Sequence, residues 1–293
     1  MRLLVVLGSV AVLGCTHRQA SAATEELSNA PVAGAVATNA KNDLPVDLSA
    51  LHQDEKASFA KLIQKYPSAC GKAHSLEVSL KTDPVCRRSV FGARYLARLL
   101  ALHQFLDSEI EEHYEARFNQ APRAKIDVEA APMRGESQAP CVLVEFSDFQ
   151  CPHCKHLQPA LERALADYRG RVRLYFKNYP ISQFHPQAQL AAQAALAAGK
   201  QGKFWQYHDA LFGGDQEHEA SSDLERVAKE LKLDVKKWRA DLDLQRAQVE
   251  RDHAQGERLE ISATPTLFIN GRRYRGPVTY DEIKDWIDEE LNP

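Results

Sequence analysis

The feature that most constrains this chain is a pair of cysteines placed where an apolar strand is followed by a helix. The segment VEFSDFQCPHCKH covers residues 144–156, with Cys151 and Cys154 separated by Pro152 and His153. The run CVLVEF before the pair predicts a buried strand, and CKHLQPALERALADYRG after it predicts an amphipathic helix. RVRLYFK then alternates apolar and polar residues, which predicts a second strand. We therefore expect a strand-helix-strand unit with both cysteines at its first turn.

The rest of the chain predicts helices around one mixed sheet. Residues from about 50 to 120 and from 186 to about 260 have helical apolar patterns. TPTLFIN and RRYRGP flank the turn Asn270-Gly271, which predicts a hairpin, and Thr279 caps a last helix. KIDVEA, before the cysteines, predicts a further short extended segment. A crossover unit followed by a hairpin gives an α/β fold, a mixed β-sheet with helices on both faces.

The N-terminus indicates export. Residues 1–15 read as a signal peptide, with an apolar run that is too short for the ~20 residues of a spanning helix. The end of this run, VLGC, resembles a bacterial lipobox, so we expect lipidation of Cys15 and anchoring to a membrane of the cell envelope. Cleavage after Ala22, which would leave an unanchored periplasmic protein, stays open. Residues 16–48 are rich in small and polar residues and predict a flexible linker.

Charge argues against one class of partner. The 37 Lys and Arg residues are balanced by 40 Asp and Glu residues and are scattered through the chain, so no nucleic-acid partner is expected. Among the remaining cysteines, Cys70 and Cys86 stand in the polar helical region of an exported chain. A bridge between them would close a loop of ~17 residues and stabilise the fold by about 3 kcal/mol, so we expect a structural disulfide. Cys141 reads as a small buried residue.

Four chemistries compete for the Cys-Pro-His-Cys turn. A c-type haem anchor requires His directly after the second cysteine, and Lys155 stands there. Zinc would use Cys151, Cys154, His153 and His156, but no second ligand pair has suitable spacing. A passive disulfide between residues i and i+3 closes too short a loop to stabilise much. Redox exchange is the favoured interpretation, without a metal or cofactor, and a copper or zinc module remains the alternative from another class.

Each position of the turn suits redox exchange. Cys151 faces the unpaired amides and the positive end of the following helix, which favours its thiolate. Pro152 fits the first helical position, and His153 can add a hydrogen bond or a positive charge to the same sulfur. A more stable thiolate makes the disulfide more oxidising. Cys154, one turn further along, is expected to be the resolving thiol.

Two other positions are candidates for the site. Glu145 lies on the apolar strand, where a carboxylate is costly, and could carry a proton to or from Cys154. A solvent-facing Glu145 at a strand edge is the alternative. Thr264-Pro265 begins an apolar strand, which suggests a cis peptide at a sheet edge that leaves the backbone of Thr264 for an extended substrate.

FSDFQCPHC, the spacing of Glu145 to Cys151, QGKFWQYHDALF and ATPTLFING resemble the DsbA-type branch of the thioredoxin superfamily. The resemblance covers residues 124–293 and implies a thioredoxin-like fold with a helical insertion at about 184–258. It leaves residues 49–120 as an N-terminal helical extension of open role. It also implies that Cys151 attacks, Cys154 resolves, Pro265 is cis and Glu145 is a buried acid.

The functional expectation is a thiol-disulfide oxidoreductase of the periplasm that acts on protein cysteines, chiefly to form disulfides. A membrane redox partner would regenerate its active site. The alternative within this class is an isomerase or reductase that such a partner keeps reduced, and the sequence leaves the direction of electron flow open.

Overall fold

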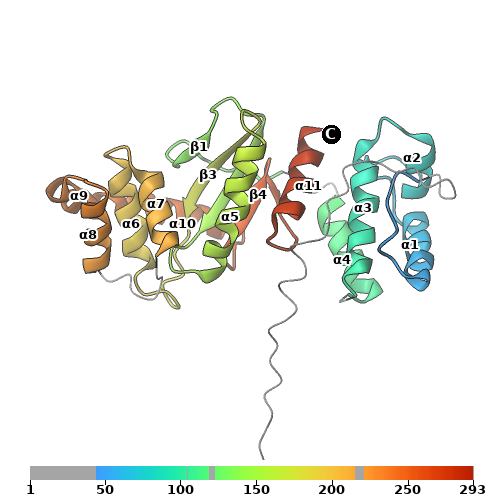
Figure 1. The fold of residues 1–293 in the computed structure, drawn as a ribbon, viewed down its shortest axis with the longest axis horizontal. Helices are drawn as coiled ribbons and strands as arrows, with labels where there is room; N and C mark the ends of the chain where they lie inside the picture. Colours follow the sequence, from blue (N-terminus) through green and yellow to red (C-terminus); the bar gives the residue numbers. More distant parts are fainter. Residues whose placement is uncertain (1–43, 104, 119–122, 215–220, 293) are drawn as a thin grey trace, which may run out of the picture.

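The computed structural model describes residues 44–292, apart from residues 104, 119–122 and 215–220. A central sheet lies between two sets of helices at opposite ends of the molecule (Figure 1). The expected signal peptide, the Cys15 lipidation site and most of the linker lie outside the described residues. Within the described ranges, no helix combines the length and the apolar character needed to cross a membrane.

In the described chain, the central sheet has five strands in the order β1-β3-β2-β4-β5. They are β1 (Met133–Gly135), β2 (Cys141–Ser147), β3 (Val172–Asn178), β4 (Thr266–Ile269) and β5 (Arg272–Arg273). β2 and β3 are parallel, with Leu143 opposite Leu174, and the other pairings are antiparallel. Because β2 is central and covered on both faces, its sequence is a nearly continuous apolar run rather than an alternating one.

Helices cover the sheet on both sides. α5 (Pro152–Asp167) and α11 (Tyr280–Leu291) pack on one face through a core that includes Leu143, Leu161 and Trp286. The other face contacts α10 (Arg246–Arg258) and the loop segments that carry Ile126 and Ile261. The expected mixed sheet with helices on both faces is confirmed.

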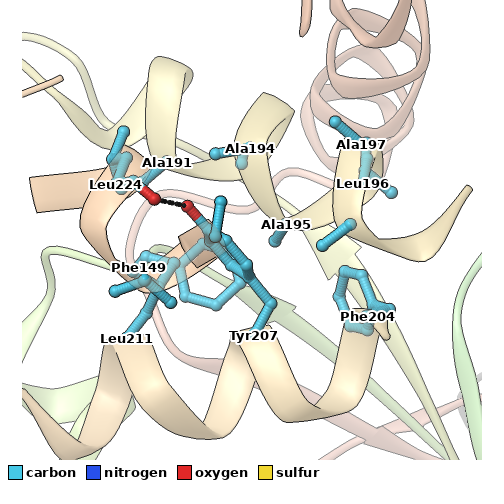
Figure 2. Packing of buried hydrophobic residues seen from close by; sticks show 14 of the residues in the cluster. Phe149, Ala191, Ala194, Ala195, Leu196, Ala197, Phe204, Tyr207, Leu211 and Leu224 are labelled. Carbon is cyan, nitrogen blue, oxygen red and sulfur yellow. Dashed lines mark hydrogen bonds between the residues drawn. The ribbon is translucent and has the colours of Figure 1, made fainter. Parts of the chain in front are cut away.

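The helices between β3 and β4 form their own core. They are α6 (Ala188–Gly199), α7 (Phe204–Gly213), α8 (Ser221–Glu230), α9 (Val235–Leu242), a 3-10 turn at Asp243–Gln245, and α10. Figure 2 shows the alanines of α6 facing Phe204, Tyr207 and Leu211 of α7. Small side chains let these helices approach closely, and the buried Tyr207 hydroxyl donates to the Leu224 carbonyl at 2.7 Å.

The N-terminal helices form a separate apolar core. They are α1 (Gln53–Lys65), α2 (Leu76–Thr82), α3 (Arg87–Ala101) and α4 (Asp107–Phe118), which pack around Phe59, Leu76 and Leu96. The expected disulfide between Cys70 and Cys86 is present and joins the segment before α2 to the start of α3.

These N-terminal helices dock on α11 through ion pairs. Arg117, whose side chain is fully buried, pairs with Asp285 at 3.0 Å and with Glu289 at 3.2 Å. Arg88 pairs with Glu289 at 2.8 Å, and Arg98 pairs with Asp285 at 2.6 Å. The N-terminal region therefore lies against the last helix of the sheet domain, at the end of the molecule opposite α6–α10 (Figure 1).

KIDVEA, expected as a short extended segment, joins no strand of the sheet. Ala124, just before it, donates its amide to the Gly271 carbonyl, and Ile126 packs on the sheet. The strand that pairs with β3 on the side away from β2 is β1, within the Pro- and Gly-containing segment that follows KIDVEA. The hairpin is confirmed, although β5 is only two residues long, and Thr279 accepts the amide of Glu282 as the expected cap.

Candidate active site

The cysteine turn lies directly beyond the C-terminal end of the central strand. β2 ends at Ser147, Cys151 is the N-cap of α5 and Pro152 is its first helical residue, as expected. Neither cysteine forms a disulfide in the structure, and Cys151 is 4% exposed and Cys154 0% exposed. The structure therefore shows the dithiol form, with Cys154 the deeper of the two sulfurs.

The two thiols have opposite acidities. The pKa of Cys151 is lowered to about 5, first by a hydrogen bond from the Cys154 thiol and also by the backbone amides of Cys154 and His153. Burial raises the pKa of Cys154 well above its ordinary value, and the neighbouring Cys151 and Glu145 raise it further. At neutral pH the pair therefore holds one thiolate, on Cys151, and one thiol, on Cys154.

Glu145 is fully buried beneath the pair. It lies on β2, and Gln158 of α5 donates to its Oε1 at 3.0 Å. Burial raises the pKa of Glu145 to about 7, and the side chains of Ser147 and Gln158 oppose this shift only in part. The alternative of a solvent-facing Glu145 at a strand edge is wrong, because β2 pairs with strands on both sides.

The peptide bond between Thr264 and Pro265 is cis and lies beside Cys151. The Cys151 sulfur lies 3.3 Å from the Thr264 carbonyl, to which it donates in its protonated form, so this loop meets the cysteine turn although 113 residues separate them. β5 pairs with β4 only at Phe268 and Ile269, so the start of β4 next to Pro265 pairs with β2 alone in the described sheet. Pro265 also lines a cavity of about 120 Å³ together with Leu157 and Tyr274.

His153 is exposed, and its effect on the Cys151 pKa comes through its backbone amide. His156 is exposed as well. The one group of potential metal ligands in the described ranges is His52, Glu55 and His103, whose ligand atoms lie within 4.8 Å of one another. The cysteine turn does not form such a group in the described structure, so the geometry gives the copper or zinc alternative no support.

Two residues of the site were not singled out by sequence reasoning. Gln158 reaches Glu145 from one turn beyond Cys154, and Asp148 joins the end of β2 to the cysteine turn. Asp148 carries a signal that could have found it, because it is a charged residue between a buried strand and a cysteine pair. Gln158 carries none, since a glutamine on a helix surface is ordinary.

A dithiol at a strand-to-helix turn, opposite a cis-proline on a mixed sheet, defines a thioredoxin-like protein. The family model described as Thioredoxin matches residues 127–289. Disulfide bond formation protein D of Bacillus subtilis is 30% identical over 187 residues, which cover 59% of this chain and 82% of that protein. The chain belongs to the thioredoxin family, within its DsbA-type branch.

Solved structures agree with this assignment. The oxidised BdbD structure from Bacillus subtilis matches with a TM-score of 0.53 and 30% identity, covering 60% of this chain and 100% of that one. A thioredoxin-like oxidoreductase from Silicibacter pomeroyi matches with a TM-score of 0.51 and 28% identity, covering 56% of this chain and 94% of that one. The expected thioredoxin-like fold is confirmed.

A second group of relatives matches only in part. The Na(+)/H(+) antiporter NhaA 3 of Salinispora tropica is 38% identical over 160 residues, which are 54% of this chain. This chain spans about a quarter of that antiporter, 24% of its length. The antiporter name is therefore not carried over to this chain.

Proposed function

We propose that this protein is a thiol-disulfide oxidoreductase that forms disulfides in other proteins through Cys151 and Cys154. The observation that carries the proposal is the opposite acidity of the two thiols, one lowered to about 5 and the other raised well above its ordinary value. A stable Cys151 thiolate favours the reduced form of the pair, which makes the corresponding disulfide oxidising.

The reaction consists of two thiol exchanges. A substrate thiolate attacks the Cys151 sulfur of the oxidised pair, and a mixed disulfide forms while Cys154 leaves as a thiolate. A second substrate thiolate then displaces Cys151, so the substrate gains a disulfide and the pair is left reduced. Thr264 and Pro265 flank the attacked sulfur, which suits them to hold an extended substrate segment.

Glu145 has the acidity of a proton carrier in this scheme. With a pKa raised to about 7 by burial, it exists in both protonation states near neutral pH. Its ionised form raises the pKa of Cys154, so the two groups interact electrostatically. Glu145 can therefore supply the proton that the departing Cys154 thiolate needs.

The cellular setting is part of the proposal. The signal peptide and the lipobox-like Cys15 support an exported, lipid-anchored protein of the bacterial periplasm. The Cys70–Cys86 disulfide supports an oxidising compartment. Repeated turnover requires an oxidant, for which a membrane redox partner is the natural source in an envelope.

The test is oxidative refolding of a reduced, unfolded substrate protein. Wild-type protein should accelerate refolding, and the Cys151→Ala variant should be inactive because its nucleophilic sulfur is lost. Cys141→Ala is the matched control, since Cys141 is a buried thiol in the core between the sheet and α5. Equal refolding rates with wild type and Cys151→Ala would refute the proposal.

The direction of electron flow has its own test, the steady-state redox state of the pair in cells. A largely oxidised pair supports disulfide formation. A largely reduced pair would instead assign the protein to isomerisation or reduction.

A further inference from the structure

Asp148 lies between the end of β2 and Cys151, and its carboxylate is completely buried. The carboxylate accepts three hydrogen bonds of 2.8 Å each, from the amides of Gln150 and Ile181 and from Nδ1 of His185. Ile181 and His185 belong to the loop after β3, which ends at the same edge of the sheet as β2 because the two strands are parallel. The Asp148 side chain is thus fixed from two separate segments.

The backbone of Asp148 contacts both halves of the cysteine pair. The Asp148 carbonyl accepts a hydrogen bond from the Cys151 amide at 3.0 Å. The Asp148 amide donates to the Cys154 sulfur at 3.5 Å. Cys154 is 0% exposed, so water does not solvate charge on that sulfur. The amide of Asp148 is therefore one of the few groups placed to do so.

The Cys154 sulfur carries charge at one moment of the reaction. When a thiolate attacks Cys151, a new S–S bond forms between the attacking sulfur and Cys151, and the Cys151–Cys154 bond breaks. The electron pair of the broken bond stays on Cys154, which leaves as a thiolate before it takes up a proton. A fixed N–H donor aimed at the atom where charge develops lowers the barrier without stabilising the uncharged states.

We propose that Asp148, held by His185, is a positioning residue that aims its own amide at the Cys154 sulfur and so stabilises the thiolate that leaves when the disulfide opens. This inference rests on the proposed function and adds to it the group that receives the leaving sulfur. His185, whose side chain is 20% exposed, connects the buried carboxylate to the solvent side of the site.

The inference predicts a change in rates without a change in equilibrium. In the reduced protein Cys154 is a neutral thiol, because its pKa is raised well above the ordinary value. The amide therefore acts on the opening and closing steps and has little effect on either end state.

The experiment measures opening of the oxidised pair by dithiothreitol under stopped flow, alongside the equilibrium constant with glutathione. Asp148→Ala should slow opening about tenfold, the effect of losing a hydrogen bond to a charged group. The equilibrium constant should stay within about twofold of the wild-type value, and the pH midpoint of Cys151 alkylation should not move.

Asp252→Asn is the matched control. Asp252 is also fully buried and also holds the end of β3, through Asn178 at 3.1 Å and Lys177 at 2.6 Å. A general loosening of this region would slow opening in both variants, whereas the positioning role predicts slowing in Asp148→Ala alone.

His185 supplies variants that keep Asp148 itself. His185→Ala should fold, since the residue is partly exposed, and should slow opening about threefold by freeing one side of the carboxylate. His185→Asn, which restores a donor near the Nδ1 position, should recover most of the rate. This series tests the inference even if Asp148→Ala does not fold.

Opening rates within twofold of wild type in both Asp148→Ala and His185→Ala would overturn the inference, as would equal slowing by Asp252→Asn. A shifted alkylation midpoint would also overturn it, because the effect would then pass through Cys151. Dithiothreitol opening is independent of protein oxidation, so a wild-type protein that cannot oxidise proteins would refute the proposed function while these rate comparisons still decide the role of Asp148.

Discussion

Two regions of the molecule contain carboxylates that are shielded from water. In the active site a carboxylate lies next to two thiols, and on α11 carboxylates lie next to arginines. Glu145, on the central strand, has its pKa raised to about 7 by burial. Asp285 of α11 is mostly buried, with 11% of its side chain exposed, but Arg98 and Arg117 outweigh the effect of burial and hold its pKa below the ordinary value. Burial alone therefore does not decide what a carboxylate does.

The groups that surround a carboxylate decide its role. A carboxylate that is matched by arginines stays ionised at neutral pH and serves as a fixed attachment point. A carboxylate that meets only an amide and a hydroxyl has two accessible protonation states, which suits proton transfer. Substitutions that alter either the arginine-paired carboxylates or Glu145 test this comparison.

The largest expected effect is on the arginine side. Arg117→Leu removes a fully buried cation from Asp285 and Glu289, and should lower the free energy of unfolding by about 3–5 kcal/mol. Urea unfolding measures this. Arg123→Leu is the control, because Arg123 is 52% exposed where it pairs with Glu290, and its loss should cost less than about 1 kcal/mol. Similar losses in both variants would show that burial of the pair is unimportant.

The disulfide of the same region should have the next largest effect. Replacing Cys70 and Cys86 together by Ala should lower the free energy of unfolding by about 3 kcal/mol, because the bridge restrains the unfolded chain. Thiol exchange at Cys151 should be unchanged in the folded variant, which the dithiothreitol assay checks. A slower exchange would mean that the N-terminal helices act on the active site.

Glu145→Gln should change stability in the opposite direction, because near neutral pH the variant should be more stable than wild type. A carboxyl whose pKa is raised from 4.5 to about 7 favours folding while it is protonated, so its contribution is complete below pH 4.5 and is lost as pH rises through 7. Between pH 4 and 8, wild type should therefore lose up to about 3 kcal/mol of stability relative to Glu145→Gln.

Unfolding curves at a series of pH values measure that difference, and Asp285→Asn supplies the contrast. The pKa of Asp285 is lowered, so its contribution is present above 3.8 and lost only as pH falls below that value. The difference between wild type and Asp285→Asn should be constant above about pH 5. A flat profile for Glu145→Gln as well would contradict the raised pKa.

Glu145 and its partners also illustrate which features can be predicted from the sequence. The strand-helix-strand unit, the hairpin and the cysteine turn are visible because apolar period and turn residues are local signals. Glu145 was recognisable as a costly charge on an apolar strand. Its partner Gln158 was not, since the contact depends on how α5 lies over β2.

The docking of the N-terminal helices on α11 could not be predicted from the sequence either. Arg117 reads as one of many scattered arginines, and only the fold brings it to Asp285 and Glu289, which lie more than 160 residues away. KIDVEA is the converse case, because its extended pattern is local, whereas its packing on a sheet face without a strand partner depends on the fold. Long-range pairing has no signature in a single sequence, whereas a motif such as Cys-Pro-His-Cys carries its chemistry locally.

The smallest expected effect concerns the order in which the two acids of the site titrate. Alkylation of Cys151 by iodoacetamide should have a pH midpoint of about 5, the pKa to which its hydrogen bonds lower it. Glu145, at about 7, is still protonated and neutral at that pH. Glu145→Gln should therefore leave the Cys151 midpoint unchanged, although it removes a titratable group beside the pair. A midpoint that falls in the variant would mean that Glu145 is already ionised when Cys151 titrates, and its role as the proton donor to Cys154 would then fail.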